Sequence, residues 1–319
     1  MCKYCMFYVY TATARTVFPD HSINRLFARF SAFLELGFLI RLLSEQQMPS
    51  KPKLGQNFLV DAQAAERIAM ALGELTGRTV GEIGPGEGAI TGALAERAGR
   101  VVAIELDREL AARLRGEFDA GRVTVVEQDV LEFDFAGAAR KAGDRLRVAG
   151  NLPYYITSPI LLKLAASYTA LELAVLMVQR EVADRVTAAP GTRDYGLLSV
   201  TAQMYGPVEP LFTLPPSAFS PPPQVHSTVV RWRFAPRFAE LDVNEDGFLR
   251  FLRQAFAQKR KTLANNLRAA GFAPAAVAAA LAQAGIDAQA RAEAVPIEAL
   301  AALWRGLENG DSTAIREMP

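Results

Sequence analysis

Apolar and polar positions change their spacing in a regular way after residue 60. From Asp61 to Leu72 the apolar residues recur at the spacing of one helix face, and Asp61 is a typical N-cap residue. Further along, short apolar runs bounded by turn residues predict strands, and periodic stretches between them predict helices. The expected strands are 79–83, 101–105, 123–127, 146–150 and 173–179, and the expected helices are 89–98, 108–118, 160–166, 182–188 and 197–204.

Strands that alternate with helices in this way predict an α/β fold with a parallel sheet covered on both faces. The pattern then changes, because 208–214 and 227–234 alternate like antiparallel strands around a Pro-rich segment and predict an antiparallel edge. From about Phe248 onward the spacing is helical and Ala is abundant, which predicts a small all-α domain. We therefore expect an α/β domain over 48–240 and a helical domain over 241–319.

The first 47 residues differ in composition from the rest of the chain. They are rich in Phe, Tyr, Arg and Cys, whereas Ala, Gly, Val and Leu dominate after Met48. The apolar stretch from Ser31 to Leu43 contains Glu35 and Arg41 and is too short and too charged to span a bilayer. An excess of Arg is typical of transit peptides, but the aromatic and Cys content does not fit one. We predict an extension that is disordered or an artefact of the gene model, and no membrane association.

Composition limits the chemistry that the chain can perform. The formal net charge of its 319 residues is only +1, so any binding of nucleic acid requires a local basic surface. The only cysteines are Cys2 and Cys5, and the only histidines are His21 and His226. These few residues argue against a disulfide framework, a catalytic thiol, a Ser-His-Asp site and a metal site. Amides, carboxylates, aromatic rings, the backbone and a bound cofactor remain.

A glycine-rich turn follows the first expected strand of the sheet. The segment Glu82–Gly88 reads Glu-Ile-Gly-Pro-Gly-Glu-Gly, with an acid two positions before Gly84. Glycines such as Gly84 and Gly86 let the backbone turn sharply and approach a ligand with no side chain in between. The spacing G-x-G-x-G differs from the G-x-G-x-x-G of dinucleotide-binding loops, and it favours a ligand without a pyrophosphate.

Two acids lie where the next two strands end. Glu105 ends the second strand and can accept both hydroxyls of a ribose, and Asp129 closes the third and can accept from an adenine amino group. Either acid alone could equally be a solvated strand-end residue. Because ligands of open α/β sheets bind at the carboxyl ends of the strands, the loop and the two acids together predict one cofactor crevice.

The fourth strand runs into Asn151-Leu152-Pro153-Tyr154, the most specific motif of the chain. The amino nitrogen of adenine is a poor nucleophile because its lone pair is delocalised into the ring. The side-chain carbonyl of Asn151 and the main-chain carbonyl of Leu152 can each accept one of its N–H bonds and direct the lone pair at a methyl donor. Pro153 restricts the turn, and Tyr154 offers a surface on which the base can stack. A plain strand-to-helix turn capped by Asn is the alternative.

Four motifs in the same order give this chain its resemblance to a known family. From Lys53 to about Phe234 it resembles the ribosomal RNA small-subunit adenine-N6 dimethyltransferases of the kasugamycin-resistance type. The family's opening motif is matched by Leu54–Leu59, its cofactor loop by Glu82–Gly88 and its catalytic motif by Asn151–Tyr154. A further motif, Phe-x-Pro-x-Pro-x-Val-x-Ser, is matched by Phe219, Pro221, Pro223, Val225 and Ser227.

The resemblance implies a Rossmann-like class I methyltransferase sheet that uses S-adenosyl-L-methionine. It implies N6,N6-dimethylation of two adjacent adenosines near the 3′ end of 16S rRNA within an immature small ribosomal subunit, by a cytoplasmic, monomeric enzyme. Phe219 should pack on the target adenine opposite Tyr154, and no metal is implied. The implied cofactor-binding residues are Asn57, Leu59, Gly84, Gly86, Glu105, Asp129 and Asn151, and the implied catalytic residues are Asn151, Leu152, Pro153, Tyr154 and Phe219.

Three positions depart from the family pattern. Tyr155 stands where members often carry Asn, which adds a second aromatic residue near the base. His226 stands where an acid is common, and Leu197 stands where an Arg is frequent. The last two departures leave the RNA contacts open.

A basic stretch near the C-terminus is the candidate RNA-binding surface. Residues 253–261 read Arg-Gln-Ala-Phe-Ala-Gln-Lys-Arg-Lys and are expected to be helical, and clustered positive charge is what contact with phosphates requires. A solvated helix face is the alternative interpretation. Other basic residues that could extend this surface are Lys51, Lys53, Arg180, Arg185 and Arg193.

Three other functions share part of this pattern. A nicotinamide-dependent dehydrogenase has the same strand order, but it normally has G-x-G-x-x-G and a catalytic His, Lys or Tyr. A DNA adenine methyltransferase usually carries a second Pro where Leu152 stands, together with a base-reading domain. A non-enzymatic role in ribosome assembly is compatible with the sequence, alone or alongside catalysis.

Overall fold

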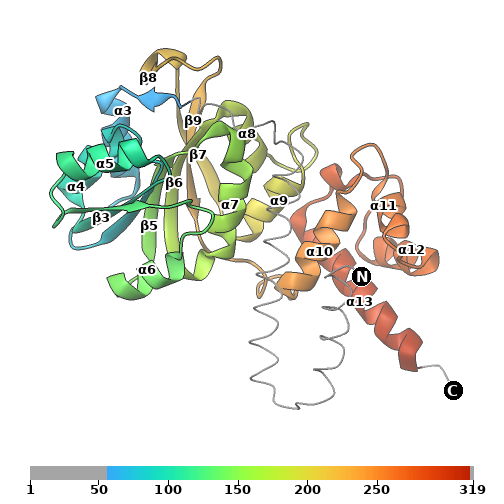
Figure 1. Ribbon diagram of the computed structural model, residues 1–319. Helices are drawn as coiled ribbons and strands as arrows, with labels where there is room; N and C mark the ends of the chain where they lie inside the picture. The colour runs from blue at the N-terminus through green and yellow to red at the C-terminus, as the bar shows by residue number, and fades with distance from the viewer. Residues whose placement is uncertain (1–55, 317–319) are drawn as a thin grey trace, which may run out of the picture. The chain divides into compact units, whose positions relative to one another are not determined.

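The computed structural model describes residues 56–316, with side chains for 56–308 (Figure 1). The predictions for residues 1–47, and those for Lys51 and Lys53, lie outside the described residues. Within the described part of the chain, none of the helices combines the length and the apolar character that a membrane crossing requires.

A seven-stranded sheet forms the centre of the α/β part, in the order β4-β3-β2-β5-β6-β9-β7. From β4 to β6 neighbouring strands are parallel, whereas β9 pairs antiparallel with both β6 and β7. The predicted parallel sheet with an antiparallel edge is therefore confirmed. The strands are β2 Thr79–Ile83, β3 Arg100–Glu105, β4 Val123–Glu127, β5 Leu146–Asn151, β6 Leu171–Gln179, β7 Val208–Leu214 and β9 Ser227–Arg233.

Helices cover both faces of this sheet (Figure 1). Apolar residues of α3 and α4 pack on one face, and those of α6, α7, α8 and α9 pack on the other. Asp61 caps α3 as expected, because its carboxylate accepts from the backbone N–H of Ala64 at 3.0 Å. The helices are α3 Ala62–Ala71, α4 Ala89–Arg97, α5 Arg108–Glu117, α6 Phe135–Ala142, α7 Thr157–Ala166, α8 Arg180–Val186 and α9 Leu197–Met204.

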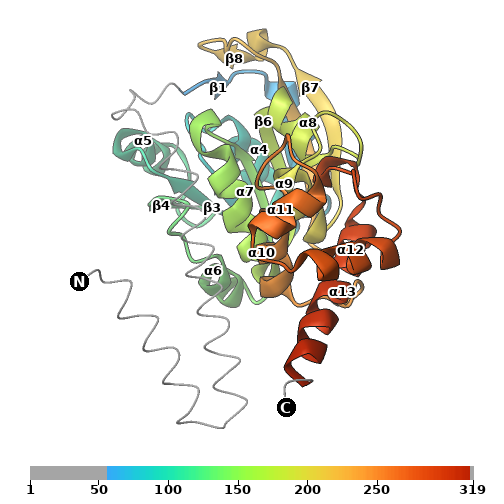
Figure 2. The same ribbon diagram turned by 90° about the vertical axis from the view of Figure 1, so that its right-hand side faces the viewer.

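The helices at the C-terminal end pack beside α9 (Figure 2). Their buried residues continue the core on the α7 and α9 face of the sheet. The Glu245 carboxylate, at the start of α10, accepts from the Tyr205 hydroxyl at 2.7 Å and from the Tyr168 hydroxyl at 3.4 Å. These helices are α10 Glu245–Ala255, α11 Leu263–Ala269, α12 Pro274–Gln283 and α13 Ile297–Arg316.

The prediction of one helix over 253–261 is wrong, because α10 ends at Ala255. The Asn266 amide nitrogen donates to the carbonyls of Ala255 at 2.7 Å and Gln258 at 3.2 Å, and these bonds stabilise a turn in place of further helix. Thr262 then caps α11 by accepting from the backbone N–H of Asn265 at 3.2 Å. The residues 258–261 therefore form a turn between two helices, which we call the basic turn.

A two-stranded sheet lies apart from the main one (Figure 2). It pairs β1, Phe58–Leu59, with β8, Phe219–Ser220, in antiparallel register. It brings the opening motif of the chain beside the Pro-rich segment that precedes β9.

Candidate active site

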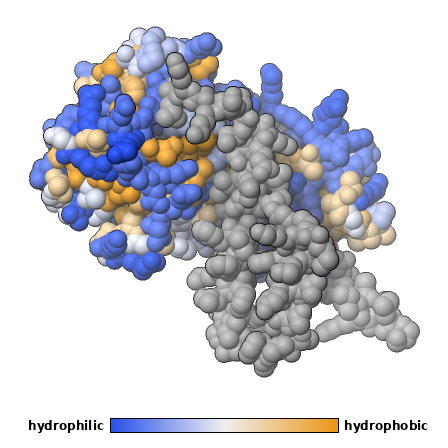
Figure 3. Space-filling model, viewed as in Figure 1, coloured by the Kyte–Doolittle hydropathy of each residue, from blue (hydrophilic) through white to orange (hydrophobic). Residues whose placement is uncertain are grey.

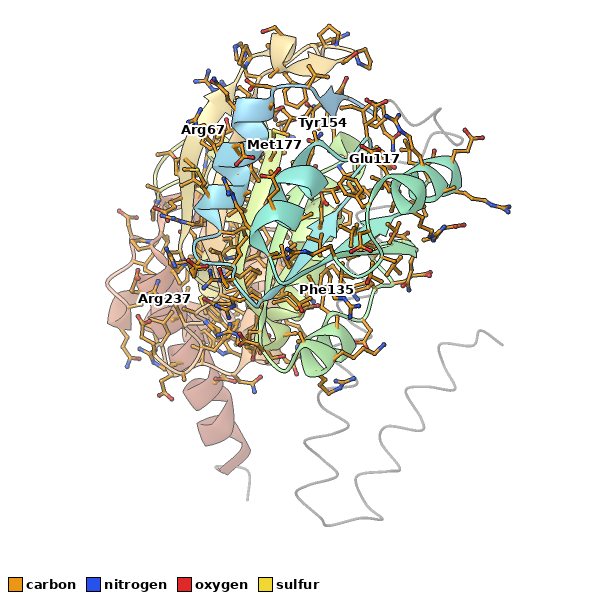
Figure 4. The ribbon with its side chains drawn as sticks, turned by 90° about the vertical axis from the view of Figure 1, so that its left-hand side faces the viewer. Arg67, Glu117, Phe135, Tyr154, Met177 and Arg237 are labelled. Atoms are coloured by element: carbon orange, nitrogen blue, oxygen red, sulfur yellow. The ribbon has the colours of Figure 1, made fainter. Side chains whose placement is uncertain are left out.

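A cavity opens at the carboxyl ends of β2, β3, β4 and β5, where the topology brings the predicted residues together. Tyr154 in its wall lies at the same end of the sheet as β1 and β8, and Arg237 lies toward the opposite end (Figure 4). Of the candidate residues, Asn57, Leu59, Gly84, Gly86, Glu105, Asp129, Asn151, Leu152, Pro153 and Tyr154 line this cavity. Phe58, Leu106 and Gln128 also line it. We did not identify these three from the sequence, although each is a direct neighbour of a predicted residue.

The glycine loop reaches the cavity in a conformation that side chains disfavour. Gly84 and Gly86 have φ of 61° and 58°, in the left-handed region. A Cβ on Gly86 would also lie 2.8 Å from Cδ1 of Phe58, so the ring of β1 packs directly on the loop. The backbone therefore forms this wall of the cavity without an intervening side chain.

The two strand-end acids are held by backbone N–H groups. Glu105 is only 3% exposed, and its Oε2 accepts from Gly86 N at 3.1 Å while Oε1 accepts from Asp107 N at 2.9 Å. Asp129 Oδ1 accepts from Leu131 N at 2.9 Å. A carboxylate oxygen has two lone pairs, so these acids are fixed in place and can still accept from a ligand.

A second acid lies beneath the glycine loop. Glu82 is 1% exposed, and its Oε2 accepts from the Thr91 hydroxyl at 2.7 Å. Burial raises the pKa of Glu82 to about 8; the Thr91 hydrogen bond opposes this increase, and the charge of Glu105 adds to it. Glu82 is therefore mainly protonated at neutral pH. It does not line the cavity, unlike Glu105 and Asp129.

The side-chain amide of Asn151 is oriented by a main-chain carbonyl. Its nitrogen, Nδ2, donates to the oxygen of Asn57 at 2.9 Å, so Oδ1 is the amide atom that can accept from a ligand. Leu152 N donates to Met177 O at 3.0 Å, and the Thr157 hydroxyl donates to Pro153 O at 3.0 Å. These bonds anchor the turn between β5 and α7 on both sides.

Two consecutive tyrosines line the cavity beside different groups. The Tyr154 hydroxyl lies 3.0 Å from the Ser227 hydroxyl, which links the catalytic motif to the end of the Phe-x-Pro-x-Pro-x-Val-x-Ser motif. Burial raises the pKa of Tyr155, and the negative charges of Asp129 and Glu105 add to the increase. The Tyr155 phenol therefore lies close enough to both strand-end acids to feel their charge.

Apolar side chains remain exposed at the mouth of the cavity. Leu106 is 53% exposed and Tyr155 is 45% exposed, and both line the cavity. Figure 3 shows hydrophobic residues among hydrophilic ones on one face of the α/β part. A ligand that covers Leu106 and Tyr155 would remove apolar surface from water.

Phe219 is the candidate residue that the structure does not bring to the cavity. Its side chain is 3% exposed and belongs to the core around Leu59, its register partner in β1, and Val229. In this arrangement the Phe219 ring supports β1 and offers no open face on which a base could stack.

Two parts of the candidate RNA-binding surface, the basic turn and the segment around Arg193, lie next to each other. The Lys259 ammonium donates to the carbonyl of Arg193 at 3.2 Å, so the basic turn lies against the loop between α8 and α9. Arg180 and Arg185 instead form ion pairs within α8, with Asp184 and Glu181.

Comparisons with known proteins show the family to which the chain belongs. A family profile described as "Ribosomal RNA adenine dimethylase" matches residues 48–307. "Ribosomal RNA small subunit methyltransferase A" of Acidobacterium capsulatum is 62% identical over 260 residues, which cover 81% of this chain and 92% of that protein. Its counterpart in Koribacter versatilis is 49% identical over 272 residues, which cover 82% of this chain and 95% of that protein.

Two solved structures share the fold over most of their length. The 23S rRNA methyltransferase ErmE superimposes with a TM-score of 0.61 and 26% identity, covering 79% of this chain and 100% of ErmE. A dimethyladenosine transferase from Plasmodium falciparum gives a TM-score of 0.66 and 24% identity, covering 81% of this chain and 98% of that protein. The sheet is thus that of the class I methyltransferases, as expected.

Proposed function

We propose a specific substrate for this chain, which belongs to the ribosomal RNA adenine dimethylase family and is therefore an rRNA adenine methyltransferase. It would dimethylate two adjacent adenosines near the 3′ end of 16S rRNA, with S-adenosyl-L-methionine as the methyl donor. The observation that best supports the proposal is the orientation of the Asn151 amide, with Oδ1 left to accept in the same cavity as Glu105 and Asp129. The substrate would be rRNA in an immature small subunit, and the enzyme would act as a cytoplasmic monomer.

The cavity fits the proposed donor at three points. Gly86 provides backbone where a side chain would collide with Phe58, Glu105 offers acceptors for ribose hydroxyls, and Asp129 offers one for an adenine amino group. Asn57, directly before β1, and Leu59 in β1 would complete the wall. When bound, S-adenosyl-L-methionine supplies an electrophilic methyl group on a sulfonium.

The protein's own contribution to the reaction is to position the amine. Asn151 Oδ1 and the carbonyl of Leu152 would accept the two N–H bonds of the adenine amino group, which turns its lone pair toward the methyl group. Pro153 has φ of −59° and holds the Leu152 carbonyl in place, and Tyr154 would stack on the base. The nitrogen releases a proton to water for each methyl group gained.

One assay tests the proposed function directly. Purified protein would be incubated with labelled S-adenosyl-L-methionine and small subunits that lack the modification, and the rRNA nucleosides would then be analysed. We expect label in N6,N6-dimethyladenosine at two neighbouring positions. Label in another nucleoside, or none under conditions in which adenosylhomocysteine raises the melting temperature, would contradict the proposal.

Tyr155 provides a test of the donor site. Tyr155→Ala should weaken adenosylhomocysteine binding roughly tenfold, because an aromatic wall beside Asp129 and Glu105 is lost. Tyr155→Phe keeps the ring and serves as the matched variant, so its difference from the native protein isolates the hydroxyl. Titration calorimetry measures both affinities, and a Tyr155→Ala variant that binds as tightly as the native protein would place this ring outside the donor site.

The basic turn provides a test of RNA binding. Changing Lys259, Arg260 and Lys261 together to Gln should weaken binding and lower the slope of log affinity against log salt by about 2 to 3, since each lost phosphate contact contributes roughly 0.7 to 0.9. The matched control changes Arg140 and Lys141 of α6 to Gln, which removes exposed charge from another part of the surface. An unchanged slope in the triple variant would exclude the basic turn from the interface.

A further inference from the structure

Residues 57–59, which are Asn57 and the strand β1, make contacts on both the donor side and the acceptor side of the proposed site. On the donor side, Phe58 packs on Gly86 of the glycine loop. On the acceptor side, the carbonyl oxygen of Asn57 receives the hydrogen bond from Asn151 Nδ2 at 2.9 Å. A single stretch of backbone therefore contacts the loop that would hold the donor and the amide that would hold the acceptor.

The strand β8 holds this segment in place. Phe58 is in register with Ser220, and Leu59 is in register with Phe219. The pairing is extended by a hydrogen bond of 2.9 Å from the backbone N–H of Val60 to the carbonyl of Ala218. The buried ring of Phe219 adds apolar packing against Leu59, which explains how two-residue strands keep a fixed position.

We propose that β1, held by β8, is a positioning element for the methyl acceptor: it fixes the main-chain carbonyl of the preceding Asn57, which determines which atom of the Asn151 amide faces the adenine amine. The inference rests on the proposed function. It gives Asn57 a role through its backbone and Phe219 a role through β1, both separate from direct contact with the donor or the base.

The physical reason lies in the near symmetry of a side-chain amide. Rotation of the Asn151 amide by half a turn would replace Oδ1 with an NH2 group, which would point N–H bonds at the N–H bonds of the substrate. The Asn57 carbonyl accepts only from the nitrogen, so it favours the productive orientation. Without this carbonyl the two orientations would compete.

The first test loosens β1 without changing a residue of the cavity. Val60 is 56% exposed and precedes the N-cap of α3, and Val60→Pro removes its N–H donor to Ala218 while restricting Leu59 to the extended backbone that a strand already has. We expect kcat, measured at saturating donor and RNA, to fall at least tenfold. The matched variant Val60→Ala keeps the N–H, and its kcat should stay within about twofold of the native value.

The second test probes the hydrogen bond between the Asn151 side chain and the Asn57 carbonyl. In Asn151→Asp the ionised carboxylate would face the Asn57 carbonyl and repel it, whereas the protonated acid can donate to it and still present an oxygen to the substrate. The kcat of Asn151→Asp, divided by that of the native protein, should therefore rise as the pH falls. The other titratable groups of the cavity are present in both proteins, so a pH dependence that they cause on their own appears in both kcat profiles: Glu87, Glu105, Asp129, Tyr154 and Tyr155, with Glu82 beneath the loop.

The outcomes separate this inference from the proposed function. Equal kcat values for Val60→Pro and Val60→Ala, or a kcat ratio for Asn151→Asp that does not rise toward acid pH, would overturn the positioning role while native methylation stays intact. A drop in Val60→Pro that excess donor restores would assign β1 to donor binding alone and would also overturn it. Native protein that fails to methylate adenosine in the small subunit would overturn the proposed function instead.

Discussion

Asn151→Ala should lower kcat for methyl transfer by about 10²–10³-fold, the usual effect of removing one preorganised hydrogen-bonding group from an active site. Alanine keeps the backbone of β5 and the bond from Leu152 N to Met177 O, but it removes both the oxygen that would accept from the adenine amine and the Nδ2 donor to Asn57. Single-turnover kinetics with saturating donor and small subunits measures the effect. Because Asn151 is one of several groups along the cavity, adenosylhomocysteine affinity should change much less than kcat.

Two controls define this result. Gln283→Ala removes an exposed amide from α12 and should leave kcat unchanged. Binding of Asn151→Ala to small subunits should also stay at the native level, because RNA affinity depends mainly on phosphate contacts elsewhere on the surface. An Asn151→Ala variant that binds small subunits but does not methylate them could then be used to test for a separate role in ribosome assembly. A variant that methylates at a rate close to native would remove Asn151 from the chemistry.

Glu82→Gln should make the protein more stable than the native form at pH 8 and leave its stability unchanged below pH 4.5. In the folded protein burial raises the pKa of Glu82 to about 8, from an ordinary value of 4.5. Between these values the unfolded chain loses the proton and the folded chain keeps it, so native stability falls as the pH rises from 4.5 to about 8. At 1.36 kcal/mol for each pKa unit, the loss is at most about 5 kcal/mol.

Urea unfolding at several pH values measures this effect. Gln cannot ionise and can still accept from the Thr91 hydroxyl, so the free energy of unfolding of Glu82→Gln should exceed that of the native protein progressively from pH 5 to pH 8. Glu96→Gln, at an exposed position of α4, is the matched control and should change stability by less than about 0.5 kcal/mol. Parallel curves for the native protein and Glu82→Gln would show that Glu82 carries its charge when folded.

The sequence predicts the main sheet well because strand and helix periodicity are local signals. Each strand of the main sheet lies within a few residues of its predicted range, and the change to alternation after residue 208 correctly indicates the antiparallel edge. The helix α6 was missed although Phe135, Ala138, Ala139 and Ala142 follow helical spacing, because it is only eight residues long and its apolar face is mostly alanine, a weak apolar signal. The helix over 253–261 was wrong because Asn266, a residue beyond the segment, stabilises a turn there.

The candidate site likewise contains features that the sequence predicts and features that it does not. The glycine loop, Glu105, Asp129 and Asn151 were predictable together because parallel strands bring their carboxyl ends to one edge. The contact between Asn57 and Asn151 was not, because it spans 94 positions and uses a backbone oxygen that every residue type possesses. The burial of Phe219 depends on a pairing of two-residue strands, which are too short to leave a pattern.

The attachment of α10 to Tyr168 and Tyr205, which lie beside the sheet, bears on how substrates would be selected. Two tyrosine hydroxyls converge on the Glu245 carboxylate, and burial raises the pKa of Tyr205 far above its usual value, so that phenol remains a donor at any physiological pH. These hydrogen bonds attach the start of α10 to the residues beside the sheet, and α10 leads into the basic turn. An RNA whose phosphates contact the basic turn, as we propose, would then be selected in part by the span from those phosphates to its reacting base, a form of selection that depends on shape and needs no contact with base edges.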